Sequence, residues 1–172
     1  MSAKNYLTYP CKVMRITQNY NGKTSHYPHT VGSPKDYPID EGGKDTGRDG
    51  FYCPCDELKI VRLYGAGNGG TNTIWVESTT KVHFADGTRD YVCGLITHPN
   101  DTDFKNLYVG RKFQRGDLIC KEGTDGATAN HLKVKSRVTV GRRTARANMF
   151  LTAQVVRTSL KPFSTSTLLS QP

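Results

Sequence analysis

Residues 1–132 consist of short segments in which apolar and polar side chains alternate, and none keeps a helical period for three turns. This alternation is typical of β-strands that bury one face. The segments cover residues 12–17, 58–64, 73–77, 81–84, 91–97 and 117–121. We therefore expect a mainly β fold, in which antiparallel sheets form a partly open barrel or sandwich with a substrate cleft.

Glycine-rich stretches between these segments predict hairpins. Residues 65–70 hold four glycines and indicate a wide turn, and Ala85-Asp86-Gly87-Thr88 has the composition of a tight one. The spacing of Gly110, Gly116 and Gly123 around Phe113 and Leu118-Ile119 predicts a further hairpin, whose strands return the chain to a sheet.

The charge of the chain is concentrated at one end. Of the 24 Lys and Arg residues that give the net charge of +9, eight lie in residues 133–172, whereas all 15 Asp and Glu residues precede them. We expect a β domain over residues 1–132 and an irregular basic tail over residues 133–172. A second hypothesis is that the tail is an out-of-frame ending, because a reading shifted by one nucleotide from the Leu132 codon can encode a segment of balanced charge. The nucleotide sequence at that codon tests this hypothesis.

Other features limit the class of protein. The first residues lack the apolar run of a secretion signal, and no stretch approaches the roughly 20 apolar residues that a membrane span needs. The five cysteines are scattered and odd in number, which favours free thiols over a disulfide framework. Cys53-Pro54-Cys55 could form half of a metal site, but no second pair completes it.

Three separated blocks hold the residues with candidate chemistry. The first runs from Gln18 through Ser25-His26 and His29 to Asp40. The second places His98 at the end of the segment 91–97, and the third is a Gly-rich turn followed by Asn130-His131-Leu132. Because residues two apart in a strand share a face, His131 and residue 133 should face the same site.

Together these blocks resemble the lysostaphin-type zinc endopeptidases, which cleave peptide cross-links in bacterial cell walls. The resemblance implies that Asp40 and either His26 or His29 bind zinc, with position 133 as the third ligand. The segment between His26 and Asp40 is longer than the common spacing, so both histidines remain candidates. The resemblance also implies that His98 and His131 move protons or stabilise the tetrahedral intermediate, while zinc activates water.

Residue 133 departs from the family pattern, because it is Lys133 rather than histidine. An ammonium group is protonated at neutral pH and has no lone pair for a metal. We therefore expect zinc to be weakly bound or absent and peptidase activity to be impaired, which leaves open whether the chain is an enzyme.

Two other functions are compatible with the sequence. One is a non-catalytic module that binds the cell wall or regulates its hydrolysis. The other is nucleic-acid binding through the basic tail, which the pattern does not favour because Phe150 and Phe163 are its only aromatic residues. The expected partner is the peptidoglycan cross-link, with no membrane partner. The absence of a signal favours a bacteriophage endolysin or virion-associated hydrolase, made in the cytoplasm and acting outside it.

Overall fold

The computed structural model describes residues 5–18, 39–43, 47–65, 71–84, 87–140, 143–145 and 168–170. These residues form a mainly β fold whose strand pairs are all antiparallel, as the alternating segments predict. The strands are β1 (Val13–Gln18), β2 (Ile39–Gly42), β3 (Gly50–Tyr52), β4 (Glu57–Tyr64), β5 (Thr73–Ser78), β6 (Val82–His83), β7 (Arg89–Thr97), β8 (Lys112–Gln114), β9 (Leu118–Lys121), β10 (Leu132–Val140), β11 (Arg143–Ala145) and β12 (Leu168–Ser170). The one helix in the described part of the chain, α1 (Asp101–Phe104), is far too short to cross a bilayer.

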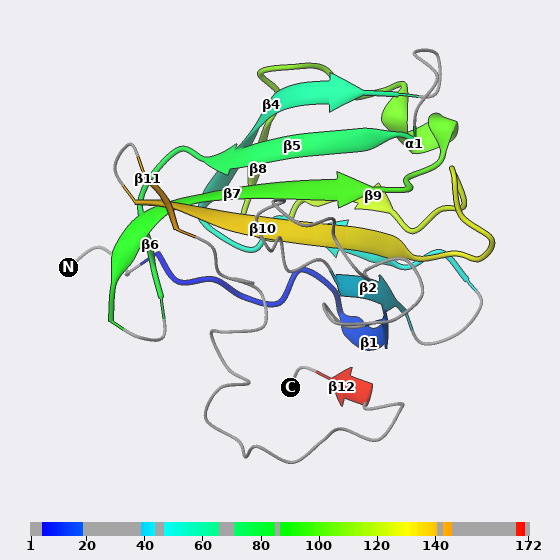
Figure 1. Cartoon of the computed structure of the whole chain (residues 1–172), viewed down its shortest axis with the longest axis horizontal. Coiled ribbons are helices and arrows are strands. Elements are labelled where there is room, and N and C mark those ends of the chain that lie inside the picture. Colours follow the sequence, from blue (N-terminus) through cyan, green and yellow to red (C-terminus); the bar gives the residue numbers. More distant parts are fainter. Residues whose placement is uncertain are drawn as a thin grey trace, which may run out of the picture.

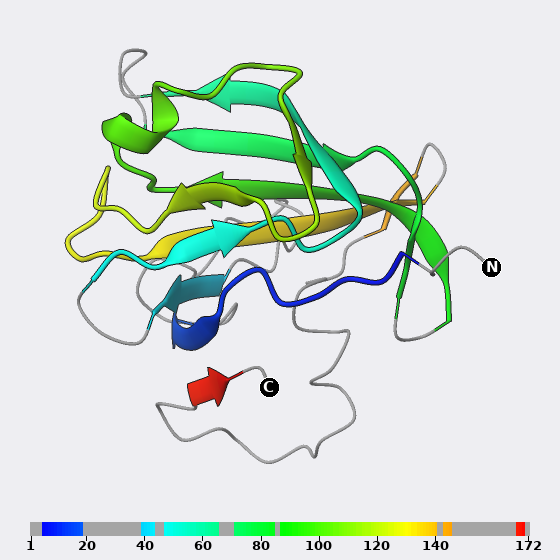
Figure 2. The same ribbon diagram turned by 180° about the vertical axis from the view of Figure 1, so that it is seen from behind.

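The larger sheet has ten strands (Figure 1). Its main path is β12-β1-β2-β10-β7-β5-β4-β8, with β11 beside β10 and β6 beside β7. Strands β3 and β9 form a second sheet, which lies against the face of the large sheet that is nearer the viewer in Figure 2. The path runs from one end strand to another, so this is an open arrangement.

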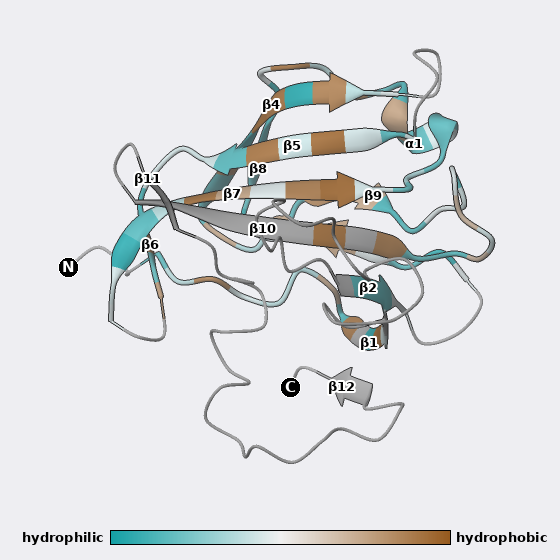
Figure 3. Ribbon diagram, viewed as in Figure 1, coloured by the Kyte–Doolittle hydropathy of each residue, from teal (hydrophilic) through white to brown (hydrophobic). Residues whose placement is uncertain are grey.

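Alternation along the strands determines which face of the large sheet is buried. From Val92 to Ile96 every second residue of β7 is buried, whereas Tyr91, Leu95 and Thr97, on the opposite face, are exposed or half-buried. In Figure 3 the apolar residues of β4, β5 and β7 form brown bands across neighbouring strands. The buried apolar residues of both sheets form one cluster, which includes Phe51, Leu58, Ile60, Ile74, Val76, Val92, Ile96, Phe113, Ile119, Leu132 and Val134. The opposite face of the large sheet, called here the outer face, is turned to the viewer in Figure 1.

Two expectations about the chain's organisation need correction. The boundary expected after residue 132 falls inside β10, which pairs with both β2 and β7 in the middle of the sheet. Residues 133–140 are therefore strand rather than an irregular tail, because Val134, Val138 and Val140 continue the alternation that starts at Leu132. The hairpin expected around Phe113 is also wrong, since β8 pairs with β4 and β9 pairs with β3.

Candidate functional site

Asp40 and residue 133 lie directly opposite one another in the large sheet. Lys133 of β10 pairs with Asp40 of β2 on one side and with Thr97 of β7 on the other. Directly opposite residues of antiparallel strands share a face and have Cβ atoms about 4.5–5.5 Å apart. Asp40 is buried, and the hydroxyl of Thr17 on β1 donates to its backbone carbonyl oxygen at 3.2 Å. The register therefore brings the expected carboxylate ligand beside the position where the family pattern has its last histidine.

The two histidines expected to assist the reaction are also neighbours. The ring centroids of His98 and His131 are 4.7 Å apart, and the rings are tilted by 50°. His98 follows the last residue of β7, and His131 precedes the first residue of β10. Because Thr97 pairs with Lys133, both rings lie at the same end of the strands as Asp40.

Hydrogen bonds fix the tautomers of both rings. Nδ1 of His98 lies 2.7 Å from the carbonyl oxygen of Asp125, and Nδ1 of His131 lies 2.9 Å from that of Ala129. A carbonyl oxygen can only accept, so each Nδ1 carries the proton in these contacts. In a neutral ring Nε2 then keeps its lone pair and can accept a proton or bind a metal.

The backbone at His98 is unusual, because its φ is +80°, in the left-handed region. Non-glycine residues rarely adopt this conformation, and it persists where surrounding contacts enforce it. The backbone N–H of His98 donates to the carbonyl oxygen of Asn72 at 3.1 Å. The sharp change of direction interrupts the alternation after Thr97 and separates His98 from the regular strand.

Asn72 connects three segments around His98. It is 1% exposed, and its side-chain amide donates to the carbonyl oxygen of Pro99 at 3.1 Å and to Oδ1 of Asp101 at 2.7 Å. Its backbone N–H donates to the carboxylate of Asp125, the residue whose carbonyl holds His98. No motif in the sequence indicated this role for Asn72 or Asp125.

Gly123 allows the turn before His131 to pack directly on the segment that follows β7. A Cβ atom at this position would lie 2.3 Å from the carbonyl oxygen of His98 and 2.5 Å from Oδ1 of Asn100. Gly123 forms a bridge with His131, and the next backbone N–H, of Thr124, donates to Oδ1 of Asn100 at 2.8 Å. The absence of a side chain at Gly123 thus sets the distance between the two histidine-bearing segments.

The described residues hold only part of the ligand set that the resemblance implies. Three protein ligands are usual at catalytic zinc sites. The register provides one carboxylate, at Asp40, and a lysine where a histidine would be required. His26 and His29 lie outside the described residues, within which no group of three His, Cys, Asp or Glu side chains could hold a metal.

Two carboxylic acids lie buried near this site and were not expected from the sequence. Glu41 follows Asp40, and the thiol of Cys11 donates to its Oε1 at 3.2 Å. Burial raises the pKa of Glu41 to about 8 and that of Glu122 to about 7. Oε2 of Glu41 and Oε1 of Glu122 are buried without a hydrogen-bond partner, which favours the protonated forms.

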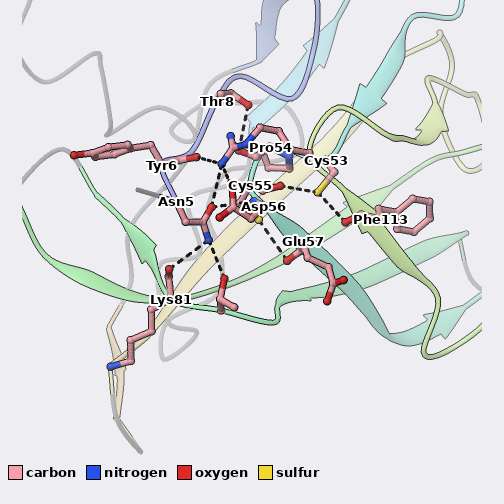
Figure 4. Close-up of polar contacts among 12 residues, drawn as sticks. Asn5, Tyr6, Thr8, Cys53, Pro54, Cys55, Asp56, Glu57, Lys81 and Phe113 are labelled. Carbon is pink, nitrogen blue, oxygen red and sulfur yellow. Dashed lines mark hydrogen bonds and ion pairs between the residues drawn. The ribbon is translucent and has the colours of Figure 1, made fainter. Parts of the chain in front are cut away.

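The turn at Cys53-Pro54-Cys55 is buried, and Figure 4 shows its polar contacts. Sγ of Cys53 lies 3.2 Å from the carbonyl oxygen of Cys55 and 3.3 Å from that of Phe113. The guanidinium of Arg115 donates to the carbonyl oxygen of Pro54 at 3.1 Å and to that of Tyr6 at 2.8 Å. These contacts attach the N-terminal segment to the turn.

A scan against protein-family models and a search of curated proteins found no match to this chain. The functional assignment therefore depends on the pattern of residues and on the geometry described above.

Proposed function

We propose that this chain is a peptidoglycan endopeptidase-like domain of the lysostaphin type whose metal site is impaired by Lys133. The observation that carries the proposal is the register that sets residue 133 opposite Asp40. Three residues that the resemblance nominated from distant parts of the sequence, Asp40, His98 and His131, lie at one end of the large sheet. Their convergence beside position 133 supports the proposal.

The chemistry available to the chain as written is limited to binding and proton exchange. The His98–His131 pair and the buried Asp40 lie at the same end of the sheet, which suits the recognition of a polar peptide. Lys133 places a protonated amine where the family pattern has a ligand, so the ability to activate water is expected to be lost. A cell-wall-binding or regulatory module that has lost the metal is the second candidate, and Lys133 is the observation that favours it.

The substitution Lys133→His tests the proposal. The variant should bind close to one zinc ion per chain and should release peptides from purified peptidoglycan, whereas the unmodified chain should retain less than about a tenth of that metal. Zinc content is measured by mass spectrometry after dialysis, and hydrolysis by the release of free amino groups.

Lys135→His is the matched control. Position 135 lies two residues further along β10 and pairs with Leu95 rather than with Asp40. It adds the same imidazole to the same strand away from the carboxylate, so zinc should not rise. Equal zinc uptake by the two variants, or none in Lys133→His, would contradict the proposed site.

A further inference from the structure

A polar pocket of about 550 Å³ lies at the other end of the same strands. It is lined by Lys59, Glu77, Ser78, Thr79, Tyr91 and Lys112. Ser78 is the last residue of β5, and Tyr91 is close to the start of β7. At the opposite end of these antiparallel strands, which is the end near the histidines, lie Thr73, the first residue of β5, and Thr97, the last residue of β7. The pocket and the histidine pair therefore lie at opposite ends of the sheet.

The pocket opens on the face of the sheet that carries Asp40. Lys59 pairs with Glu77, and Glu77 pairs with Cys93. Because Glu77 is four residues from Thr73, the two share the outer face, and Thr73 pairs with Thr97. From Glu77 to Asp40 the separation is about 13 Å along the strands and about 14 Å across them, or roughly 20 Å in total.

The lining of the pocket holds two ammonium groups and one carboxylate, and a second carboxylate, of Glu57, lies beside it. Nζ of Lys112 forms an ion pair with Oε1 of Glu57 at 3.0 Å, and Lys59 lies opposite Glu77. With Glu57 counted, two carboxylates accompany the two ammonium groups, so the pocket carries no net charge that would select an anionic ligand. Ammonium, carboxylate and hydroxyl groups together offer many donors and acceptors to a neutral polar ligand.

Tyr91 gives the pocket an aromatic surface. Its side chain is 44% exposed, and the ammonium of Lys81 lies 5.9 Å from the ring centroid. An exposed tyrosine ring presents an apolar face next to a polar hydroxyl, which matches the amphipathic faces of a pyranose. A ring with several hydroxyl groups and a neutral amide would use both features of the pocket.

We propose that this pocket is a subsite for an N-acetylated hexosamine of the peptidoglycan strand. The inference rests on the proposed function, because it assigns the glycan to this pocket and the attached peptide to the end of the sheet that holds His98, His131 and Asp40. Peptidoglycan consists of N-acetylated hexosamines that carry short peptides. A peptide of six extended residues reaches roughly 20 Å, which matches the separation of the two sites.

The test is a titration of the full chain with the tetramer of N-acetylglucosamine, followed by NMR of the backbone amides. Shifts should concentrate at β5, β7 and the residues that line the pocket. Tyr91→Ala and Glu77→Ala should each weaken binding at least tenfold. Tyr108→Ala, which removes a tyrosine that is 64% exposed outside the pocket, should leave the affinity unchanged.

Three results would overturn the inference: no binding of the tetramer, binding unaffected by both pocket variants, or shifts at the pocket caused by a stem pentapeptide but not by the sugar. Failure of the proposed function is recognised separately, because zinc uptake by Lys133→His does not involve Tyr91. Zinc uptake can be measured in Lys133→His alone and in Lys133→His combined with Tyr91→Ala. If both variants take up zinc but the sugar does not bind, only the glycan subsite is wrong and the proposed function stands.

Discussion

At the scale of single residues, the sequence predicted some members of the candidate site but not the residues that hold them in place. Asp40, His98 and His131 belong to motifs, so their chemistry and spacing identified them. The sequence contains no motif that predicts the roles of Asn72 and Asp125 or the left-handed conformation of His98. These features depend on hydrogen bonds between segments that only folding brings together. The histidine ligand from the first block lies outside the described residues and stays a prediction.

The choice between His26 and His29 can be made in the Lys133→His background. Zinc bound by that variant should fall at least tenfold when the true ligand is replaced by alanine, because two protein ligands hold the ion much less tightly than three. Alanine at the other histidine should leave the zinc content unchanged. Metal analysis of the two double variants checks this, and loss of zinc in neither would exclude both histidines.

Gly123→Ala should disturb His98 without touching its side chain. The added Cβ would fall within 2.3 Å of the carbonyl oxygen of His98, so the turn must move away. We expect a loss of stability of about 1–3 kcal/mol, typical of overpacking, and a change in the NMR signals of the His98 ring. Thr124→Ala, in the same turn and at an exposed position, is the control and should lie within about 0.5 kcal/mol of the unmodified chain in guanidinium unfolding. A stable Gly123→Ala with an unchanged His98 would contradict this account.

At the scale of elements, strands with several alternating residues were predicted well. The expected segments 58–64, 73–77 and 91–97 match β4, β5 and β7 to within two residues. The short strands β2 and β3 were not predicted, although the expected segments 81–84 and 117–121 contain the equally short β6 and β9. β10 was missed for another reason. Its two lysines and one arginine alternate with Val134, Ser136 and Val138, but the basic composition of residues 133–172 was interpreted as a whole and this alternation over nine residues was not recognised.

Val134→Ala tests whether β10 is part of the folded core. Val134 is buried in the apolar cluster and pairs with Ile39 of β2 and Ile96 of β7. Removing its two methyl groups should lower the free energy of unfolding by about 2 kcal/mol. The exposed turn residue Thr128 gives the control, Thr128→Ala, for which guanidinium unfolding should show little change. If Val134→Ala were as neutral as the control, residues 133–140 would be a tail after all.

For the whole molecule, the burial of two carboxylic acids predicts that stability depends on pH. Burial raises the pKa of Glu122 to about 7 from its ordinary value of 4.5. Between these values the folded state holds a proton that the unfolded state has lost, so stability should fall as the pH rises from about 4.5 to about 7. Glu41, with a pKa raised by burial to about 8, should act in the same direction.

Glu122→Gln should make this dependence shallower. The amide keeps an oxygen that can accept from the backbone N–H of Asp49, which lies 3.3 Å from Oε2 of Glu122, and it carries no charge. Midpoints of guanidinium unfolding measured from pH 5 to pH 8 should decline less in the variant than in the unmodified chain. Asp90→Asn, a substitution of a half-buried carboxylate on β7, serves as the control for removal of one negative charge. Parallel pH profiles for all three proteins would exclude Glu122 as a source of the dependence.

The central place of β10 also makes the chain a candidate for reassembly from fragments. β10 is the strand that connects β12-β1-β2 to β7-β5-β4-β8 along the path of the large sheet. A polypeptide cut in the exposed turn at residues 128–129 would separate Asp40 and His98 from the strand that aligns them. A synthetic peptide that begins near Asn130 could then complement the truncated chain. Peptides with different side chains at position 133 would change the residue opposite Asp40 while the truncated chain stays the same.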